Sequence, residues 1–277
     1  MSESNTSEHE FLNAGFETPA MELVRTPAFQ SKRLECCGVD PAAHGANWAP
    51  GLLGTDCFQH LGDVGQSIAG SVHVDMRLIQ SHPVPLARLL TIQGRTERVI
   101  DAPRGPISAM VFTFKDPDGP DSKVAFRVEI GVLMPTPDTM DRPPMARSAS
   151  VPPTDPPTDP RDGFVKHGAR QLEPQHVQAY GGARNPIHLD PEFAQNLGFR
   201  APIAHGVMTA VYLLGALDTP TAPTRLDASF SFRRPVFWDD AMELWASEFG
   251  GDESCYRSLN DVGKVTAEMA VARADYA

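Results

Sequence analysis

The chain has few cysteines and no apolar run long enough to cross a membrane. Among its 277 residues, Cys36 and Cys37 are adjacent, while Cys57 and Cys255 stand alone. This pattern has neither the density of a disulfide scaffold nor the spacing of a metal-ligand set, so we expect buried or inert thiols. Because no long uncharged apolar stretch is present, the sequence predicts a soluble protein.

Basic residues are fewer than acidic ones: the chain has 24 Lys and Arg and 35 Asp and Glu, which gives a formal net charge of −11. Non-specific binding to nucleic acid depends on clusters of Lys and Arg, so that function is not expected. The first ten residues are acidic and polar and lack the order of a secretory signal or transit peptide. We therefore expect a cytoplasmic protein without a membrane partner, in which a local basic pocket could still bind a small anion.

Proline is concentrated in one stretch. Nine prolines lie between Pro135 and Pro160, and a segment that lacks so many backbone donors is expected to be an extended linker. The chain is also longer than a typical single domain. The sequence thus predicts an N-terminal half at 1–134, a linker at 135–163 and a C-terminal half at 164–277, with disorder considered for the first ~20 residues.

Alternating apolar residues predict antiparallel strands in both halves. The alternation covers Val72–Leu78, Met110–Phe114 and Val124–Ile130 before the linker, and Ala228–Phe232, Met242–Ala246 and Val265–Val271 after it. In the first half we interpret the strands as a meander, with a turn at Asp116–Gly119, and we interpret Trp238–Asp240 as a hairpin connection. Ala204–Leu217 is apolar nearly all round, so it is predicted to be a buried helix. An α+β fold follows, with an antiparallel sheet wrapped around buried helices.

Five segments of the second half fall in an order that resembles a known family. They are Asn185–Pro191 (NPIHLDP), Phe193-Ala194, Gly198-Phe199, Pro202–Gly206 (PIAHG) and Phe232–Val236 (FRRPV). Together they resemble the MaoC-like, R-specific enoyl-thioester hydratases and dehydratases. That resemblance is strong over about 171–236. It implies a double hot-dog fold in which the C-terminal half carries the motif and the N-terminal half is degenerate.

Local chemistry gives these residues roles of their own. Asp190 and Pro191 suit the start of a short helix that Gly198 would end, so His188 lies on the irregular segment just before that helix. The next helix begins near Gly206, where unpaired N–H groups could polarise a thioester carbonyl. By resemblance, His188 is the catalytic acid-base and Gly206 supplies the oxyanion-binding N–H.

One catalytic position departs from the family. The resembled enzymes have an aspartate five residues before the histidine, and this chain has Ala183 there. Three interpretations remain open: His188 works alone or with another carboxylate, the chemistry has changed, or the site binds thioesters without turnover. Asp190 is a candidate replacement, although helix capping accounts for it better. An acidic residue of the N-terminal half is the other candidate.

Six further residues are candidates for binding substrate or shaping the site: Tyr180, Arg184, Asn185, His205, Arg233 and Arg234. We expect Asn185 to hold its own loop and His205 to orient the helix start or pack against the sheet. Arg233 or Arg234 could meet the phosphates of a coenzyme A or phosphopantetheine carrier, or be exposed charges at a strand edge. Tyr180 and Arg184 could contact ligand or face solvent.

The leading interpretation is a lyase of fatty acid metabolism that interconverts 2-enoyl and 3-hydroxyacyl thioesters. The alternatives are an acyl-CoA thioesterase and a non-catalytic protein that binds acyl thioesters or regulates a partner. No metal or redox cofactor is implied, because coenzyme A or phosphopantetheine enters only as the substrate's carrier. By resemblance, a homodimer is expected.

Overall fold

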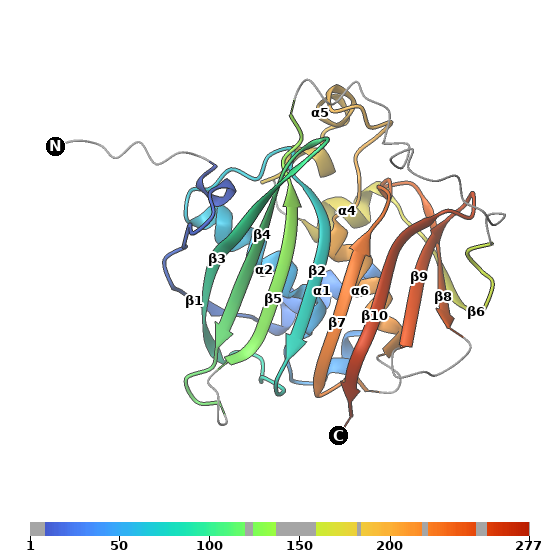
Figure 1. Ribbon diagram of the computed structural model, residues 1–277. Helices are drawn as coiled ribbons and strands as arrows, with labels where there is room; N and C mark the ends of the chain where they lie inside the picture. Colours follow the sequence, from blue (N-terminus) through green and yellow to red (C-terminus); the bar gives the residue numbers. More distant parts are fainter. Residues whose placement is uncertain are drawn as a thin grey trace.

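A computed structural model describes residues 9–119, 124–136, 159–181, 184–217, 221–247 and 254–276. Its strands form one antiparallel sheet in the order β1-β3-β4-β5-β2-β7-β10-β9-β8-β6. The sheet curves around α1, α2 and α6, which lie against one of its faces (Figure 1). The strands are β1 (Met21–Val24), β2 (Val72–Gln80), β3 (Leu89–Ala102), β4 (Gly105–Lys115), β5 (Val124–Leu133), β6 (Phe164–Gln171), β7 (Arg225–Phe232), β8 (Ala241–Ser247), β9 (Ser254–Asn260) and β10 (Val265–Asp275).

The helices are short and lie mainly between the first strands of each half. The α-helices are α1 (Pro27–Cys37), α2 (Leu53–Asp63), α4 (Pro174–Tyr180), α5 (Pro191–Asn196) and α6 (Gly206–Leu214). The 3₁₀ turns are η1 (Glu10–Leu12), η2 (Pro41–His44), η3 (Pro50–Leu52), η4 (Pro186–His188) and η5 (Gly215–Leu217). No helix in the described ranges is long and apolar enough to span a membrane.

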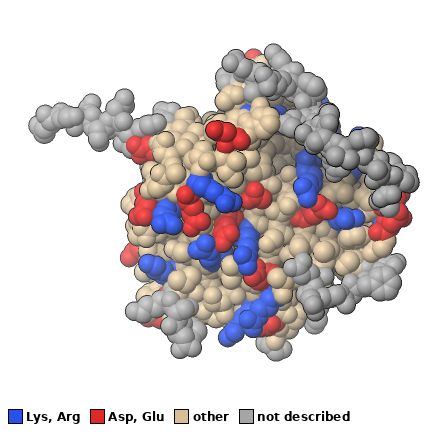
Figure 2. All heavy atoms as spheres, viewed as in Figure 1, with Lys and Arg blue, Asp and Glu red and all other residues tan. Residues whose placement is uncertain are grey.

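The two halves are joined by the pairing of β2 with β7. The register runs from Asp75 opposite Ser231 to Gln80 opposite Leu226, and Arg77 on β2 donates to both carboxylate oxygens of Asp227 on β7 at 3.0 and 2.9 Å. Acidic and basic side chains are interspersed over this face of the molecule (Figure 2). The predicted α+β architecture, with two hot-dog halves edge to edge in one sheet, is confirmed.

The predicted strands and the Asp116–Gly119 turn are present. At that turn, the carbonyl of Asp116 accepts from the Gly119 N–H at 3.1 Å, and its side chain accepts from the Asp118 N–H at 3.1 Å. Residues 137–158 of the expected linker and residues 1–8 of the segment considered for disorder lie outside the described residues, so both expectations stay predictions there.

Two connections differ from the predicted ones. β2 pairs with β5 and not with β3, so only β3, β4 and β5 form a meander. The loop after β2 is hydrogen-bonded to the segment before α2. The Trp48 N–H donates to the Val84 carbonyl at 2.8 Å, and the Leu86 N–H donates to the Ala46 carbonyl at 2.6 Å. β7 and β8 are not neighbours either, so Trp238–Asp240 is a crossover and not a hairpin. Alternation identifies a strand but not its neighbour.

Helix α6 is buried as predicted, and it begins at Gly206. Every residue from Val207 to Leu214 is buried, and glycines of the N-terminal half let its helices approach α6 closely. A Cβ on Gly54 would lie 3.0 Å from the Val207 side chain, and one on Gly51 would lie 3.0 Å from Leu214. The central helices of the two halves therefore share one hydrophobic core.

The four cysteines are free, and three of them are buried, namely Cys36, Cys37 and Cys57. Burial raises the pKa of the Cys57 and Cys37 thiols well above the ordinary value, which keeps them protonated and unreactive. Within the described ranges no group of three or more His, Cys, Asp or Glu side chains is placed to hold a metal ion.

An ion pair buried in the N-terminal half ties the segment before α1 to α2. Arg25 donates to the Asp56 carboxylate, and the two residues are 2% and 5% exposed. The guanidinium also lies over Trp48, 4.2 Å from the ring centroid, and donates to the Ala49 carbonyl at 2.8 Å. Burial raises the pKa of Asp56, and Arg25 opposes that shift.

Removing one partner of this pair should cost more than removing both. Arg25→Met leaves a buried carboxylate without its cation, and we expect a loss of about 3–5 kcal/mol in the free energy of unfolding. Arg25→Met combined with Asp56→Leu should lose much less. Urea denaturation of the three proteins measures this, and equal losses in the single and double variants would contradict it.

Candidate functional site

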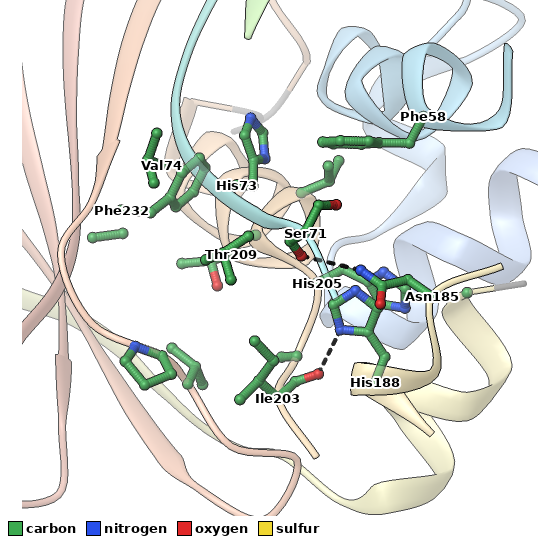
Figure 3. A pocket seen from close by; sticks show the side chains of 18 of the residues that line it. Phe58, Ser71, His73, Val74, Asn185, His188, Ile203, His205, Thr209 and Phe232 are labelled. Carbon is green, nitrogen blue, oxygen red and sulfur yellow. Dashed lines mark hydrogen bonds between the residues drawn. The ribbon is translucent and has the colours of Figure 1, made fainter. Parts of the chain in front are cut away.

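A cavity of about 300 Å³ lies between the two halves. The N-terminal half lines it with residues of α1, α2 and β2, and the C-terminal half with residues of α4, η4, α6 and β7. Figure 3 shows part of the lining, with His73 and Phe58 on one side and His188, His205 and Asn185 on another. Most of the predicted site residues meet here.

Asn185 holds the loop that carries His188 against the other half. Its Oδ1 accepts from the Gly70 N–H at 3.0 Å and its Nδ2 donates to the Ser71 carbonyl at 3.1 Å. The same Oδ1 caps η4 by accepting from the Ile187 N–H at 3.4 Å. This explains Asn185 more fully than the sequence could, because the amide fixes both its own turn and the start of β2.

His188 is held in one tautomer. Its Nδ1 lies 2.8 Å from the carbonyl oxygen of Ile203 (Figure 3), and a carbonyl only accepts, so Nδ1 carries the hydrogen. Nε2 is therefore the nitrogen with the lone pair. Burial lowers the pKa of His188 to about 4, although the bond to Ile203 opposes the shift. At neutral pH the ring is uncharged and can accept a proton.

His205 packs against His188 with the two rings tilted by 32°. The two ring centroids are 3.6 Å apart, and the Tyr180 ring lies 5.4 Å from His205 on another side. A Cβ on Gly181 would stand 2.1 Å from His205 Nε2, so only glycine at 181 leaves room for this ring. Burial, followed by the nearby His188 and the positive charge of Arg33, lowers the pKa of His205 well below its ordinary value.

Gly206 is the first residue of α6 and lines the cavity. The N–H groups of a first helical turn have no partner inside the helix and carry partial positive charge. His205 at the N-cap position makes no side-chain capping bond, and its carbonyl accepts from the Met208 N–H at 2.9 Å. The N–H groups of Gly206 and Val207 are therefore the ones that a ligand oxygen could bind. The cavity therefore places a neutral base, His188, near a helix end able to stabilise negative charge.

His73 is a pocket residue that the sequence did not single out. It lies on β2 between Phe58 and Phe232, with ring centroids 5.2 and 4.6 Å away, and a Cβ on Gly206 would be 3.1 Å from its Nδ1. Burial lowers its pKa to about 3. The half without a motif contributes His73, Thr55 and Arg33 to the cavity. The only sequence signal for any of them was that His73 is a polar residue in an alternating strand.

Arginines surround the cavity, whereas none of its described lining residues is Asp or Glu. Arg184 pairs with Asp63. Arg233 donates to Glu268 at 2.8 Å, and Arg234 donates to the Val265 carbonyl at 2.6 Å. These three arginines are exposed, so they mark the solvent side of the site. Arg233 and Arg234 are therefore exposed charges that also line the cavity, and their contact with carrier phosphates stays a prediction.

Asp190 is the predicted candidate that the structure does not bring to the site. It is exposed, does not line the cavity, and accepts from the N–H groups of Glu192 and Phe193 at 2.9 and 3.1 Å as the N-cap of α5. Helix capping, and not proton transfer, accounts for this side chain. Ala183 lies outside the described residues.

Comparison with known sequences supports this reading of the second half. Residues 160–270 match the family model of the MaoC like domain. The 3-hydroxyacyl-thioester dehydratase X of Mycobacterium tuberculosis is 24% identical over 198 residues, 70% of this chain. The (R)-specific enoyl-CoA hydratase of Aeromonas caviae is 41% identical over 59 residues, 20% of this chain. The matches span 65% and 44% of those two relatives.

Solved structures share the fold over nearly the whole chain. The crystal structure of HtdX from Mycobacterium tuberculosis superposes with a TM-score of 0.73 at 20% identity, covering 94% of this chain and 100% of that one. A second Mycobacterium tuberculosis protein, described as a double hot-dog fold, gives 0.60 at 14% identity, covering 94% and 95%. The predicted resemblance is confirmed: residues 160–270 match the MaoC like domain, and the chain has a double hot-dog fold.

Proposed function

We propose that this protein is an acyl-thioester hydratase or dehydratase that interconverts 2-enoyl and 3-hydroxyacyl thioesters. The observation that carries the proposal is the neutral His188, fixed by Ile203 and placed in one cavity with the first turn of α6. The family match and the names of the two curated relatives agree with this class of reaction.

Hydration needs a base for water and a site for the charge on the thioester oxygen. The oxygen of water bonds to Cβ while His188 Nε2 takes one of its protons, and the electrons of the double bond move onto the thioester oxygen. The N–H of Gly206 stabilises that oxyanion. The imidazolium then returns its proton to Cα as the carbonyl re-forms, so water ends as the Cβ hydroxyl and the Cα hydrogen.

The carrier is proposed to enter from the side of Arg233 and Arg234. These exposed arginines suit the phosphates of coenzyme A or phosphopantetheine. The protein is further proposed to act in the cytoplasm as a homodimer, in keeping with the sequence expectation.

A second candidate function is binding of acyl thioesters without turnover. It is favoured by the lack of any Asp or Glu among the described residues that line the cavity, because the resembled enzymes use an aspartate beside the histidine. Hydrolysis of the thioester has no comparable observation in its favour. Measuring binding beside turnover separates the candidates.

The first test is His188→Asn with crotonyl-CoA and longer 2-enoyl-CoAs. The asparagine amide can keep the bond to the Ile203 carbonyl while removing Nε2, so the fold should stay intact and hydration should fall about 10²–10⁴-fold. Loss of absorbance from the conjugated double bond measures hydration, and release of free thiol measures hydrolysis.

The matched control is His167→Asn, which changes an exposed histidine on β6. It should hydrate like the natural protein. Thiol release that disappears in His188→Asn would assign hydrolysis instead. Binding of saturated acyl-CoAs without either signal would leave the binding function standing alone.

The pH dependence of hydration should reflect the depressed pKa of His188. A base with a pKa of about 4 loses its lone pair only as the pH falls through that value, so kcat/KM should hold between pH 7 and 5 and fall below. An ordinary histidine would lose activity near pH ~6.5. Circular dichroism at each pH shows whether the protein is still folded, and an acid limb near the ordinary value would contradict the assignment.

Ala183→Asp should raise hydration. The substitution supplies the carboxylate that the resembled enzymes place five residues before the histidine, and a partner of this kind contributes roughly 10²–10⁴-fold to proton transfer. Ala183→Asn is the matched control, because it has similar size without a basic oxygen. Equal rates for the natural protein and both variants would mean that the site does not use a carboxylate there.

A further inference from the structure

Arg33 is a cation at the cavity that no acidic side chain of the described residues neutralises. It lies on α1 of the N-terminal half and lines the cavity. Its guanidinium carbon stacks 3.7 Å from the centroid of Phe29 and lies 6.0 Å from that of Tyr180. Its Nε is shielded from solvent and has no hydrogen-bond partner.

The acidic residue that acts on the charge of Arg33 is already paired with another arginine. Asp56 acts on Arg33 electrostatically, but its carboxylate is bound by Arg25 in the buried ion pair. A partly buried guanidinium with no carboxylate partner is unfavourable, since burial costs a charge much of its hydration. Burial accordingly lowers the pKa of Arg33. In a protein of net charge −11, this leaves a site of unbalanced positive charge.

Arg33 differs from the arginines on the solvent side of the cavity. Arg184, Arg233 and Arg234 are exposed and already bonded to protein groups. Arg33 is half-buried and close enough to His205, which packs against His188, to lower the pKa of the His205 ring. Its charge therefore acts next to the histidine pair.

We propose that Arg33 binds a carboxylate on the acyl group, so that the preferred substrates are thioesters of dicarboxylic acids. This assignment rests on the proposed function for the thioester and its carrier, and adds the chemical class of the acyl chain. A planar guanidinium matches a carboxylate with two parallel hydrogen bonds. The substrate would then bring the negative charge that the described lining of the cavity lacks.

The test compares two substrates of equal carbon number, 2-pentenedioyl-CoA and 2-pentenoyl-CoA. The natural protein should hydrate the dicarboxylic thioester with a kcat/KM roughly 10- to 100-fold higher, the range typical of a hydrogen bond to a charged group. Arg33→Gln should abolish that preference. Arg33→Lys should keep part of it, because it retains the charge without the planar fork.

Lys32→Gln is the matched control, because it removes one positive charge from the neighbouring, exposed position of α1. It should leave the preference unchanged. Calorimetric binding of glutaryl-CoA, pentanoyl-CoA and free coenzyme A gives a readout that does not depend on turnover.

Three results would overturn the proposal. The first is that the natural protein favours the uncharged acyl group, and the second is that Arg33→Gln keeps the preference for the dicarboxylic thioester. The third is that Arg33→Gln weakens the binding of all three ligands by the same factor, which would place Arg33 at the carrier. A preference for glutaryl-CoA that is lost in Arg33→Gln, without hydration of any thioester, would support the acyl class and refute the proposed reaction.

Discussion

The antiparallel pairing of β2 with β7 is the constraint on which the rest of the molecule depends. It turns two small sheets into one and brings the helices of both halves onto the same concave face. Since the cavity is lined from both sides of this seam, neither half contains a complete site. Asn185 adds polar cross-links at the cavity end, where it bonds the residues just before β2.

Desolvation governs the chemistry of the cavity. Three histidines, His73, His188 and His205, all have lowered pKa values, and burial is the first cause in each case. The positive charge of Arg33 acts in the same direction on His205. Backbone hydrogen bonds oppose the shift at His73 and His188, but the described lining of the cavity has no carboxylate that would raise these pKa values further. The histidines are thus bases and hydrogen-bonding groups, not cations.

The sequence was most informative where a structural role depends on neighbours along the chain. Asp190 as a helix cap, the Asp116 turn and the all-round apolar α6 could be predicted because capping, turns and periodicity are local. The motif further identified Asn185, His188, His205 and Gly206 as neighbours in space.

The sequence was least informative where pairing occurs over long distances. The position of β2 beside β5 and β7, and the crossover at Trp238–Asp240, follow from how the halves pack. Arg33 and His73 reach the cavity through the same packing, since they lie 155 and 115 residues before His188 and belong to no motif. A motif in one half cannot reveal what the other half contributes to a shared site.

Joining the two halves in one chain also changes how the site responds to dilution. A cavity formed between separate subunits would lose one wall whenever the subunits dissociate, so the fraction of intact sites would depend on protein concentration. Here both walls belong to one chain, so the effective concentration of one wall at the other does not fall on dilution. The seam between β2 and β7 can therefore form with a modest intrinsic affinity, and the two walls are free to diverge in sequence.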